Sequence, residues 1–115
     1  MKKPKQKIIL KGIGASPGKA KGKVKILNFP EEIEKINGRE IIVTSFLTPD
    51  FIAAVKRSRR ILGVITDKGG LTCHAAIVVR ELKIPYIAGA IKATKKLREN
   101  MAIDMDGEKG IIWES

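Results

Sequence analysis

The chain has 115 residues, a length that suits one domain and excludes an enzyme with separate nucleotide and substrate domains. Hydrophobic residues make up 43% and charged residues 30%, which is typical of a globular rather than a disordered chain. The single cysteine, Cys73, excludes an internal disulfide and a zinc site built from several cysteines. No apolar run approaches the ~18 residues of a membrane span or the core of a signal peptide, so we expect a cytoplasmic protein.

The charge is strongly positive, with 23 lysines and arginines against 12 acidic residues and a net charge of +11. Residues 1–25 contain nine lysines and no acidic residue. This excess is explained either by a solvated strand face or by an anionic partner: an acidic protein surface, a phosphorylated substrate or nucleic acid. Aromatic residues amount to only 4%, which disfavours a stacking platform for single-stranded nucleic acid.

The first half of the chain predicts alternating strands and helices. One strand is expected before Lys19. Residues 19–27 then alternate between lysines and small or apolar residues, as in a strand with one wet face. The lysines of this strand therefore line one side of it. A short helix, a buried strand and a second helix are predicted next, at residues 30–36, 40–44 and 48–57.

The second half continues the alternation and closes with a hairpin around Asp106-Gly107. Its predicted elements are a strand at 61–66, a helix at about 72–82, a strand at 86–88, a short helix at about 93–99, and hairpin strands at 101–105 and 110–113. The core stripe of the 72–82 helix is predicted from its spacing as Ala75, Val78, Val79 and Leu82. The order predicts a mixed α/β fold with at least one parallel β-α-β unit.

The chain is predicted to hold a single domain. We assign residues 1–9 to a basic N-terminal extension and residues 10–115 to the domain itself. Met1 at the start and a regular strand at the end favour a complete chain over a fragment of a longer protein.

One segment, residues 66–76, combines a strand end, a double-glycine turn and a helix start. Gly69 and Gly70 let the backbone turn sharply and approach a ligand closely. The free N–H groups of the first helical turn favour negative charge, and Thr72 can cap the helix or bind an anion through its hydroxyl. His74, the only histidine, lies about 90° from the predicted core stripe and should face solvent.

A neutral imidazole at such a position is a nucleophile that can take up a phosphoryl group. From the residues alone, a lone histidine near a helix start is more often a plain polar surface residue. The absence of a second histidine or a carboxylate cluster nearby argues against a metal site. Cys73 is interpreted either as a reactive thiol at a helix start or as a small packed side chain.

The stretch from Gly69 to Pro85 resembles the phosphohistidine signature of the enzymes that use phosphoenolpyruvate (PEP). It is most similar to that of phosphoenolpyruvate synthase (pyruvate, water dikinase), and pyruvate phosphate dikinase and enzyme I of the sugar phosphotransferase system are relatives. The similarity covers about residues 10–114. Further motifs in the family's order are Gly14-Ala15-Ser16-Pro17-Gly18, Thr48-Pro49-Asp50 and Asp104-Met105-Asp106-Gly107.

This resemblance implies the swivelling β/β/α phosphohistidine domain. It implies that His74 is phosphorylated from a nucleotide-binding domain and passes the phosphoryl group on at a separate barrel domain. Gly69 and Gly70 match the turn that exposes the histidine, and Thr72 matches a threonine that a regulatory kinase modifies in phosphoenolpyruvate synthases. Among the departures, Lys83 replaces the glycine that commonly follows this helix.

The chain is too short to include the ATP-grasp domain or the PEP-binding barrel. We therefore expect it to bind no cofactor itself, with ATP and magnesium on a partner component. The leading prediction is a free-standing phosphoryl carrier that works in trans with an ATP-grasp kinase component and a PEP/pyruvate barrel component. The alternatives are a non-catalytic regulatory module for a full-length synthase or its regulatory kinase and, least favoured, a basic nucleic-acid binder.

Overall fold

A single mixed sheet organises the molecule, which a computed structural model describes for residues 6–58, 60–70 and 73–115. The strands are β1 (Ile8–Lys11), β2 (Ile13–Ser16), β3 (Lys19–Ile26), β4 (Glu40–Thr44), β5 (Ile61–Thr66), β6 (Tyr86–Ala88), β7 (Ala102–Asp106) and β8 (Ile111–Glu114). The helices are the 3₁₀ helix η1 (Pro30–Lys35) and the α-helices α1 (Pro49–Arg57), α2 (His74–Glu81) and α3 (Ala93–Lys96).

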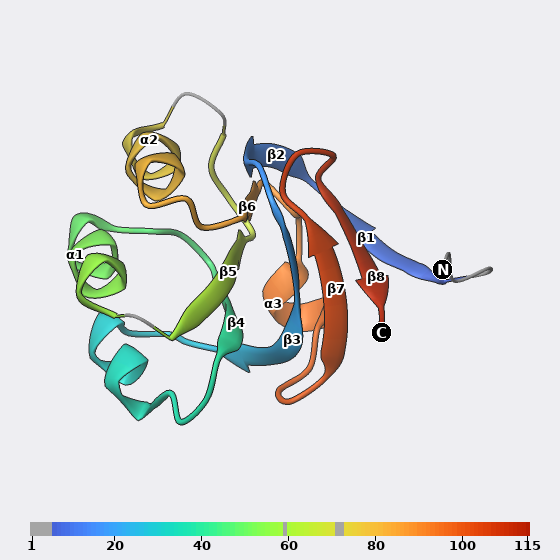
Figure 1. Cartoon of the computed structure of the whole chain (residues 1–115), viewed down its shortest axis with the longest axis horizontal. Helices are drawn as coiled ribbons and strands as arrows, with labels where there is room; N and C mark the ends of the chain where they lie inside the picture. The colour runs from blue at the N-terminus through green and yellow to red at the C-terminus, as the bar shows by residue number, and fades with distance from the viewer. Residues whose placement is uncertain (1–5, 59, 71–72) are drawn as a thin grey trace.

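The strand order in the sheet is β1-β8-β7-β3-β4-β5-β6-β2. The neighbours β3, β4, β5 and β6 pair in parallel, whereas the remaining pairs are antiparallel. Strands β1 and β2 stand at opposite ends of this order although Gly12 alone separates them in the chain, so the sheet curls round on itself (Figure 1). The Gly12 N–H donates to the Gly110 carbonyl at 2.8 Å, which continues the pairing of β1 with β8 up to the start of β2.

Both faces of the central strand β4 are buried. Ile42 belongs to a core cluster beneath α1, α2 and η1, which lie together on one side of the sheet (Figure 1). Ile41 and Val43 point the other way, into a second cluster enclosed by the curled sheet and α3. A strand covered on both faces is an uninterrupted apolar run, as the sequence of β4 predicts.

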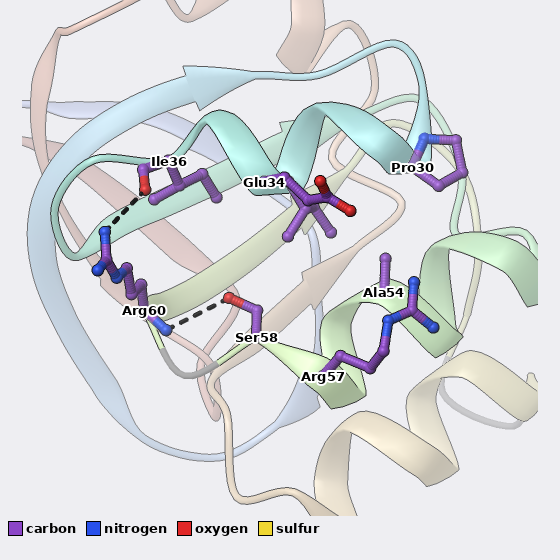
Figure 2. A pocket seen from close by; sticks show the side chains of 8 residues that line it. Pro30, Glu34, Ile36, Ala54, Arg57, Ser58 and Arg60 are labelled. Carbon is purple, nitrogen blue, oxygen red and sulfur yellow. Dashed lines mark hydrogen bonds between the residues drawn. The ribbon is translucent and has the colours of Figure 1, made fainter.

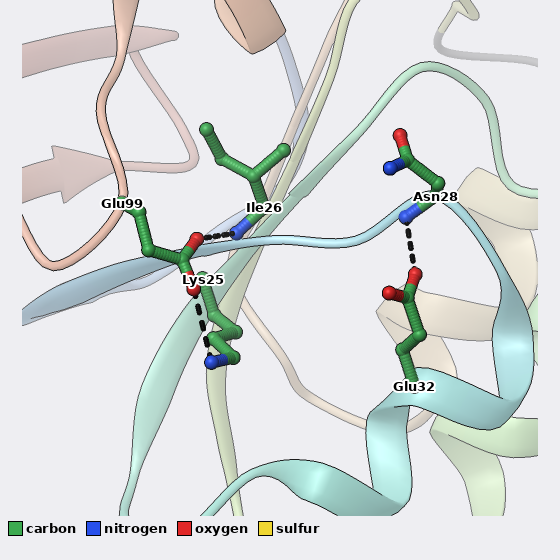
Figure 3. A network of polar contacts seen from close by, with 5 residues as sticks. All are labelled: Lys25, Ile26, Asn28, Glu32 and Glu99. Carbon is green, nitrogen blue, oxygen red and sulfur yellow. Dashed lines mark hydrogen bonds and ion pairs between the residues drawn. The ribbon is translucent and has the colours of Figure 1, made fainter.

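Local capping explains why the helices begin where they do. The Thr48 side chain accepts the Phe51 N–H at 3.2 Å, and Pro49 occupies the first position of α1. At the start of η1, the Glu32 carboxylate accepts the Asn28 N–H at 2.6 Å (Figure 3) and the Phe29 N–H at 2.7 Å. These two hydrogen bonds hold the pKa of Glu32 below its usual value.

The predicted α/β class is confirmed, and strands β4, β5 and β6 have the predicted bounds. Two strands rather than one precede Lys19, because β1 and β2 pair with different edges of the curled sheet. Strand β1 begins at Ile8, inside the predicted extension of residues 1–9. Among the described residues, none of the helices has the length and apolarity that a bilayer crossing requires.

Helices α2 and α3 differ from their predictions. Helix α2 begins at His74 rather than Thr72, and Leu82 is 36% exposed instead of lying in the core. The buried stripe is Ala75, Ala76 and Val79, because Leu82 already caps the helix end. Helix α3 ends at Lys96 instead of residue 99.

Candidate functional site

The candidate site lies where β5 ends and α2 begins. His74 is the first residue of α2 and its side chain is exposed, as the sequence predicts. Behind it, Ala75 and Ala76 are buried in the core cluster that joins α2 to β2 and β6. The histidine is therefore held on a firmly packed helix start while its ring faces solvent.

A buried pair of hydroxyls holds the first residues of the loop that follows β5. The Thr66 hydroxyl donates to the Lys68 carbonyl at 2.6 Å and lies 3.0 Å from the Tyr86 hydroxyl. Because Thr66 has a single hydrogen and a carbonyl cannot donate, Tyr86 donates to Thr66. Burial raises the pKa of Tyr86 to about 12. The phenol thus stays protonated and keeps its role as a donor.

A second anchor reaches the loop from the start of α3. The Asp67 carboxylate accepts the Thr94 N–H at 2.8 Å and the Thr94 hydroxyl at 2.6 Å. The Lys68 N–H donates to the Ser45 carbonyl at 3.1 Å, which ties the loop to the residue after β4. Asp67, Thr94 and Tyr86 were missed as site residues by sequence reasoning, since 27 residues separate Asp67 from Thr94.

The two glycines of the turn serve different needs. Gly69 has a φ of +116°, a conformation that other residues rarely adopt, and a Cβ there would approach the Tyr86 hydroxyl to 3.4 Å. A Cβ at Gly70 would meet no atom of the described residues within 4 Å. Gly69 is therefore required by the backbone conformation, whereas the described residues leave space for a side chain at Gly70.

Cys73 occupies the N-cap position of α2, but its side chain makes no capping hydrogen bond. Its thiol instead donates to the Gly70 carbonyl at 3.0 Å, and the residue is half-buried. This contact matches the predicted small packed side chain better than a freely exposed thiol. Thr72, the other predicted cap and anion ligand, lies outside the described residues.

Helix α2 is also tied to the edge strand β2 beside it. The Arg80 Nε and Nη2 groups donate to the Ala15 carbonyl of β2 at 3.1 and 2.9 Å. Among the described residues, no group of three His, Cys, Asp or Glu side chains is arranged to hold a metal ion. The arrangement therefore offers a nucleophilic imidazole and helix N–H groups, and the chemistry that suits both is capture of an anionic electrophile.

A hollow of about 540 Å³ lies elsewhere, between η1 and α1 (Figure 2). Arg60 closes one end by donating from Nη1 to the Ile36 carbonyl at 3.2 Å, and its N–H donates to the Ser58 hydroxyl. None of the residues that line this hollow belongs to the segment from Thr66 to His74. The hollow is therefore separate from the candidate site.

Residues 36–110, about two-thirds of the chain, match the family described as "PEP-utilising enzyme, mobile domain". The chain belongs to this family. It is 52% identical over 108 residues to the probable phosphoenolpyruvate synthase of Archaeoglobus fulgidus. That alignment covers 94% of this chain but 14% of the synthase, so the mobile domain described here spans about one-seventh of the relative's length.

Two solved structures share the fold. The solution structure of Enzyme I (nEIt) superposes with a TM-score of 0.60 at 30% identity, over 70% of this chain and 32% of the other. The aconitase X structure from Thermococcus kodakaraensis gives a TM-score of 0.64 at 22% identity, over 90% of this chain and 95% of the other. The second likeness concerns the fold alone, and the two chains are of nearly the same extent.

Proposed function

We propose that this mobile domain carries a phosphoryl group on His74, between a nucleotide-dependent kinase component and a separate acceptor component. The observation that carries the proposal is the exposed ring of His74 at the first residue of α2, beside a loop anchored by Thr66 and Asp67. Membership of the PEP-utilising family supports the same chemistry.

The transfer step needs only groups that this position supplies. A ring nitrogen of neutral His74 attacks the phosphorus of the donor, a P–N bond forms, and the P–O bond to the leaving group breaks. The leaving oxygen departs with the bonding electron pair, and the ring proton is lost to solvent. Helix N–H groups at the start of α2 favour the dianionic phosphoryl group by roughly 0.3–1 kcal/mol.

The remaining chemistry is assigned to partners. An ATP-grasp kinase component holds ATP and magnesium, and a PEP/pyruvate barrel component receives the phosphoryl group. Similarity to the much longer synthases supports this division, because the chain corresponds to about one-seventh of such a protein. Thr72, two residues before His74, is the proposed target of a regulatory kinase, and Gly69 and Gly70 keep the approach to the ring open.

The test uses the Archaeoglobus fulgidus synthase from which the matching mobile segment has been deleted, together with ATP labelled on its phosphates. The chain should become labelled, and the label should be lost in acid and kept in base, as a phosphoramidate requires. His74 is the only histidine, so His74→Ala should abolish the label. Cys73→Ser, a change at the neighbouring residue, should retain it.

Equal labelling of the wild type and His74→Ala would refute the carrier function. An unlabelled chain that still binds the deleted synthase would favour the non-catalytic module instead. The purified chain alone should hydrolyse no ATP, because the nucleotide site belongs to the kinase component.

A further inference from the structure

On the side of the sheet where α1, α2 and η1 lie, no helix of the described part of the chain covers β3, β7 and β8. Lys25 of β3 lies beside Ile42 of β4 in the parallel register, so the lysines of β3 share the sheet face that α1, α2 and η1 cover over β4. The helices do not extend over β3, and the side chains of Lys19, Lys21 and Lys23 are exposed (Figure 1).

Strand register brings an aromatic side chain into this lysine array. Lys21 pairs with Asp104 of β7, Asp104 pairs with Trp113 of β8, and Trp113 pairs with Ile8 of β1. Directly paired residues point to the same face of a sheet, so these four form one row. We call the surface made by Lys19, Lys21, Lys23, Asp104 and Trp113 the lysine face.

The charge of the lysine face is unbalanced. Among the described residues, Lys19, Lys21 and Lys23 form no ion pair, whereas Lys25 at the edge pairs with Glu99 at 2.9 Å. The carboxylate of Asp104 accepts a hydrogen bond from the Gln6 side chain at 2.7 Å instead of meeting a lysine. Three ammonium groups two residues apart along one strand thus remain available to an anionic surface.

The centre of the lysine face is hollow and partly apolar. A depression of about 320 Å³ is lined by residues that include Lys19, Lys21, Asp104 and Trp113. Ile8, at the end of the row, is 45% exposed. An aromatic centre with a charged rim is the usual make-up of a protein interface.

We propose that the lysine face is a docking surface for an acidic protein segment that places an apolar side chain against Trp113. Carboxylates of the partner meet the ammonium groups of Lys19, Lys21 and Lys23. Charge complementarity of this kind mainly raises the association rate. The proposal does not depend on phosphorylation of His74, which belongs to a helix on the covered half of the sheet.

Two features favour a protein over nucleic acid as the occupant. The Asp104 carboxylate lies within the row between Lys21 and Trp113, where it would repel a phosphate backbone crossing the face. Single-stranded nucleic acid is also held by several aromatic side chains that stack on successive bases, and Trp113 is the only tryptophan of the chain. A protein segment can face Asp104 with a neutral side chain.

The experiment titrates the intact chain with two probes of equal net charge: a short peptide of alternating glutamate and leucine, and an oligothymidylate. Trp113 fluorescence reports binding at the lysine face directly, because no other tryptophan contributes. We expect the peptide to bind more tightly than the oligothymidylate and its affinity to fall as salt rises. Tighter binding of the oligothymidylate would overturn the proposal in favour of nucleic acid.

A matched pair of triple variants locates the site. Lys19→Gln, Lys21→Gln and Lys23→Gln together should weaken peptide binding about tenfold. Lys35→Gln, Lys56→Gln and Lys95→Gln remove the same net charge from exposed positions on η1, α1 and α3 and should leave the affinity nearly unchanged. Equal weakening by both triple variants would mean attraction by net charge alone and would refute a docking surface.

Discussion

One face of one sheet is built in two different ways on its two halves. Over β4, β5 and β6 it is buried by helices, and Ile42 and Val64 have no exposed surface. Over β3, β7 and β8 the same face carries exposed lysines and a half-buried tryptophan. The packing of the covered half therefore holds His74 in place. The exposed residues of the lysine face do not contribute to this packing, so their charge can serve binding instead.

The largest expected effect is a difference in stability between substitutions in the two halves of this face. Ile42→Ala removes buried methyl groups beneath the helices and should lower the free energy of unfolding by roughly 2–5 kcal/mol. Lys23→Ala, on the neighbouring strand and the same face, should change it by less than about 0.5 kcal/mol. Urea unfolding followed by circular dichroism measures both values.

Similar losses for Ile42→Ala and Lys23→Ala would show that the two halves contribute equally to stability. In that case the lysine aliphatic stems would pack on the sheet far more than their exposure indicates.

The anchor of the His74 loop gives the next prediction. Thr66→Val keeps the shape of the buried side chain but leaves the Lys68 carbonyl and the Tyr86 hydroxyl without their partner. We expect a loss of roughly 1–3 kcal/mol, the cost of unsatisfied buried polar groups. Thermal unfolding measures it, and labelling of His74 should fall as the loop loses its fixed shape.

Tyr86→Phe provides the control for this anchor. The Thr66 hydroxyl keeps its bond to Lys68 in this variant, so the loss should be smaller than in Thr66→Val. A larger loss in Tyr86→Phe would mean that the phenol, and not the bond to Lys68, fixes the loop.

The difference between the halves explains which features the sequence predicts. Strand β4 is a continuous apolar run and β3 alternates strictly, and both patterns follow from local burial, so their elements were predicted within a residue. The exposed His74 on a helix start was predicted from spacing in the same way. The local sequence pattern is sufficient to predict an element when burial alternates or stays constant along that element.

Features created by pairing between distant segments were not predictable from local pattern. Trp113 joins the lysines only through the register of β7 and β8, and Thr94 meets Asp67 only because the end of β5 lies beside the start of α3. The curl of the sheet likewise depends on two distant pairings, β1 with β8 and β2 with β6. The low aromatic content of the chain therefore did not reveal that a tryptophan lies among the lysines of this face.

A smaller effect of opposite sign is expected at the end of α2 on the covered half. Lys83 has a φ of +61°, a conformation that is strained for a residue with a side chain. The family resemblance, in which glycine commonly follows this helix, is consistent with this strain. Lys83→Gly should therefore stabilise the fold by up to about 1 kcal/mol, measured as a raised midpoint in urea. Lys56→Gly inside α1 should destabilise it by a similar amount, because its backbone is helical. A Lys83→Gly variant that loses stability would show that the lysine side chain contributes more than the strain costs.

The smallest effect belongs to the ion pair at the edge of the lysine face, Lys25 with Glu99 (Figure 3). The hydrogen bond that the Lys25 ammonium donates to the Glu99 carboxylate raises the pKa of Lys25 above 10.5. Burial raises the pKa of Glu99, but the Ile26 N–H and the Lys25 ammonium outweigh it, so this pKa lies below 4.5. The stabilisation is thus fully present between these values, lost as the pH falls through the lowered pKa of Glu99 and lost as it rises through the raised pKa of Lys25.

Glu99→Gln isolates the charge of this pair, since the amide oxygen can still accept the Ile26 N–H. The side chains are 28% and 42% exposed, so solvent screening limits the expected loss to about 0.2–1 kcal/mol at neutral pH. The loss should shrink in high salt and vanish in acid, where Glu99 is protonated. Urea unfolding at several pH values measures it, with Glu31→Gln, an exposed carboxylate without an ion pair to described residues, as the control. A loss that persists unchanged in acid would show that the charge of Glu99 is not its cause and would refute a contribution of the ion pair to stability.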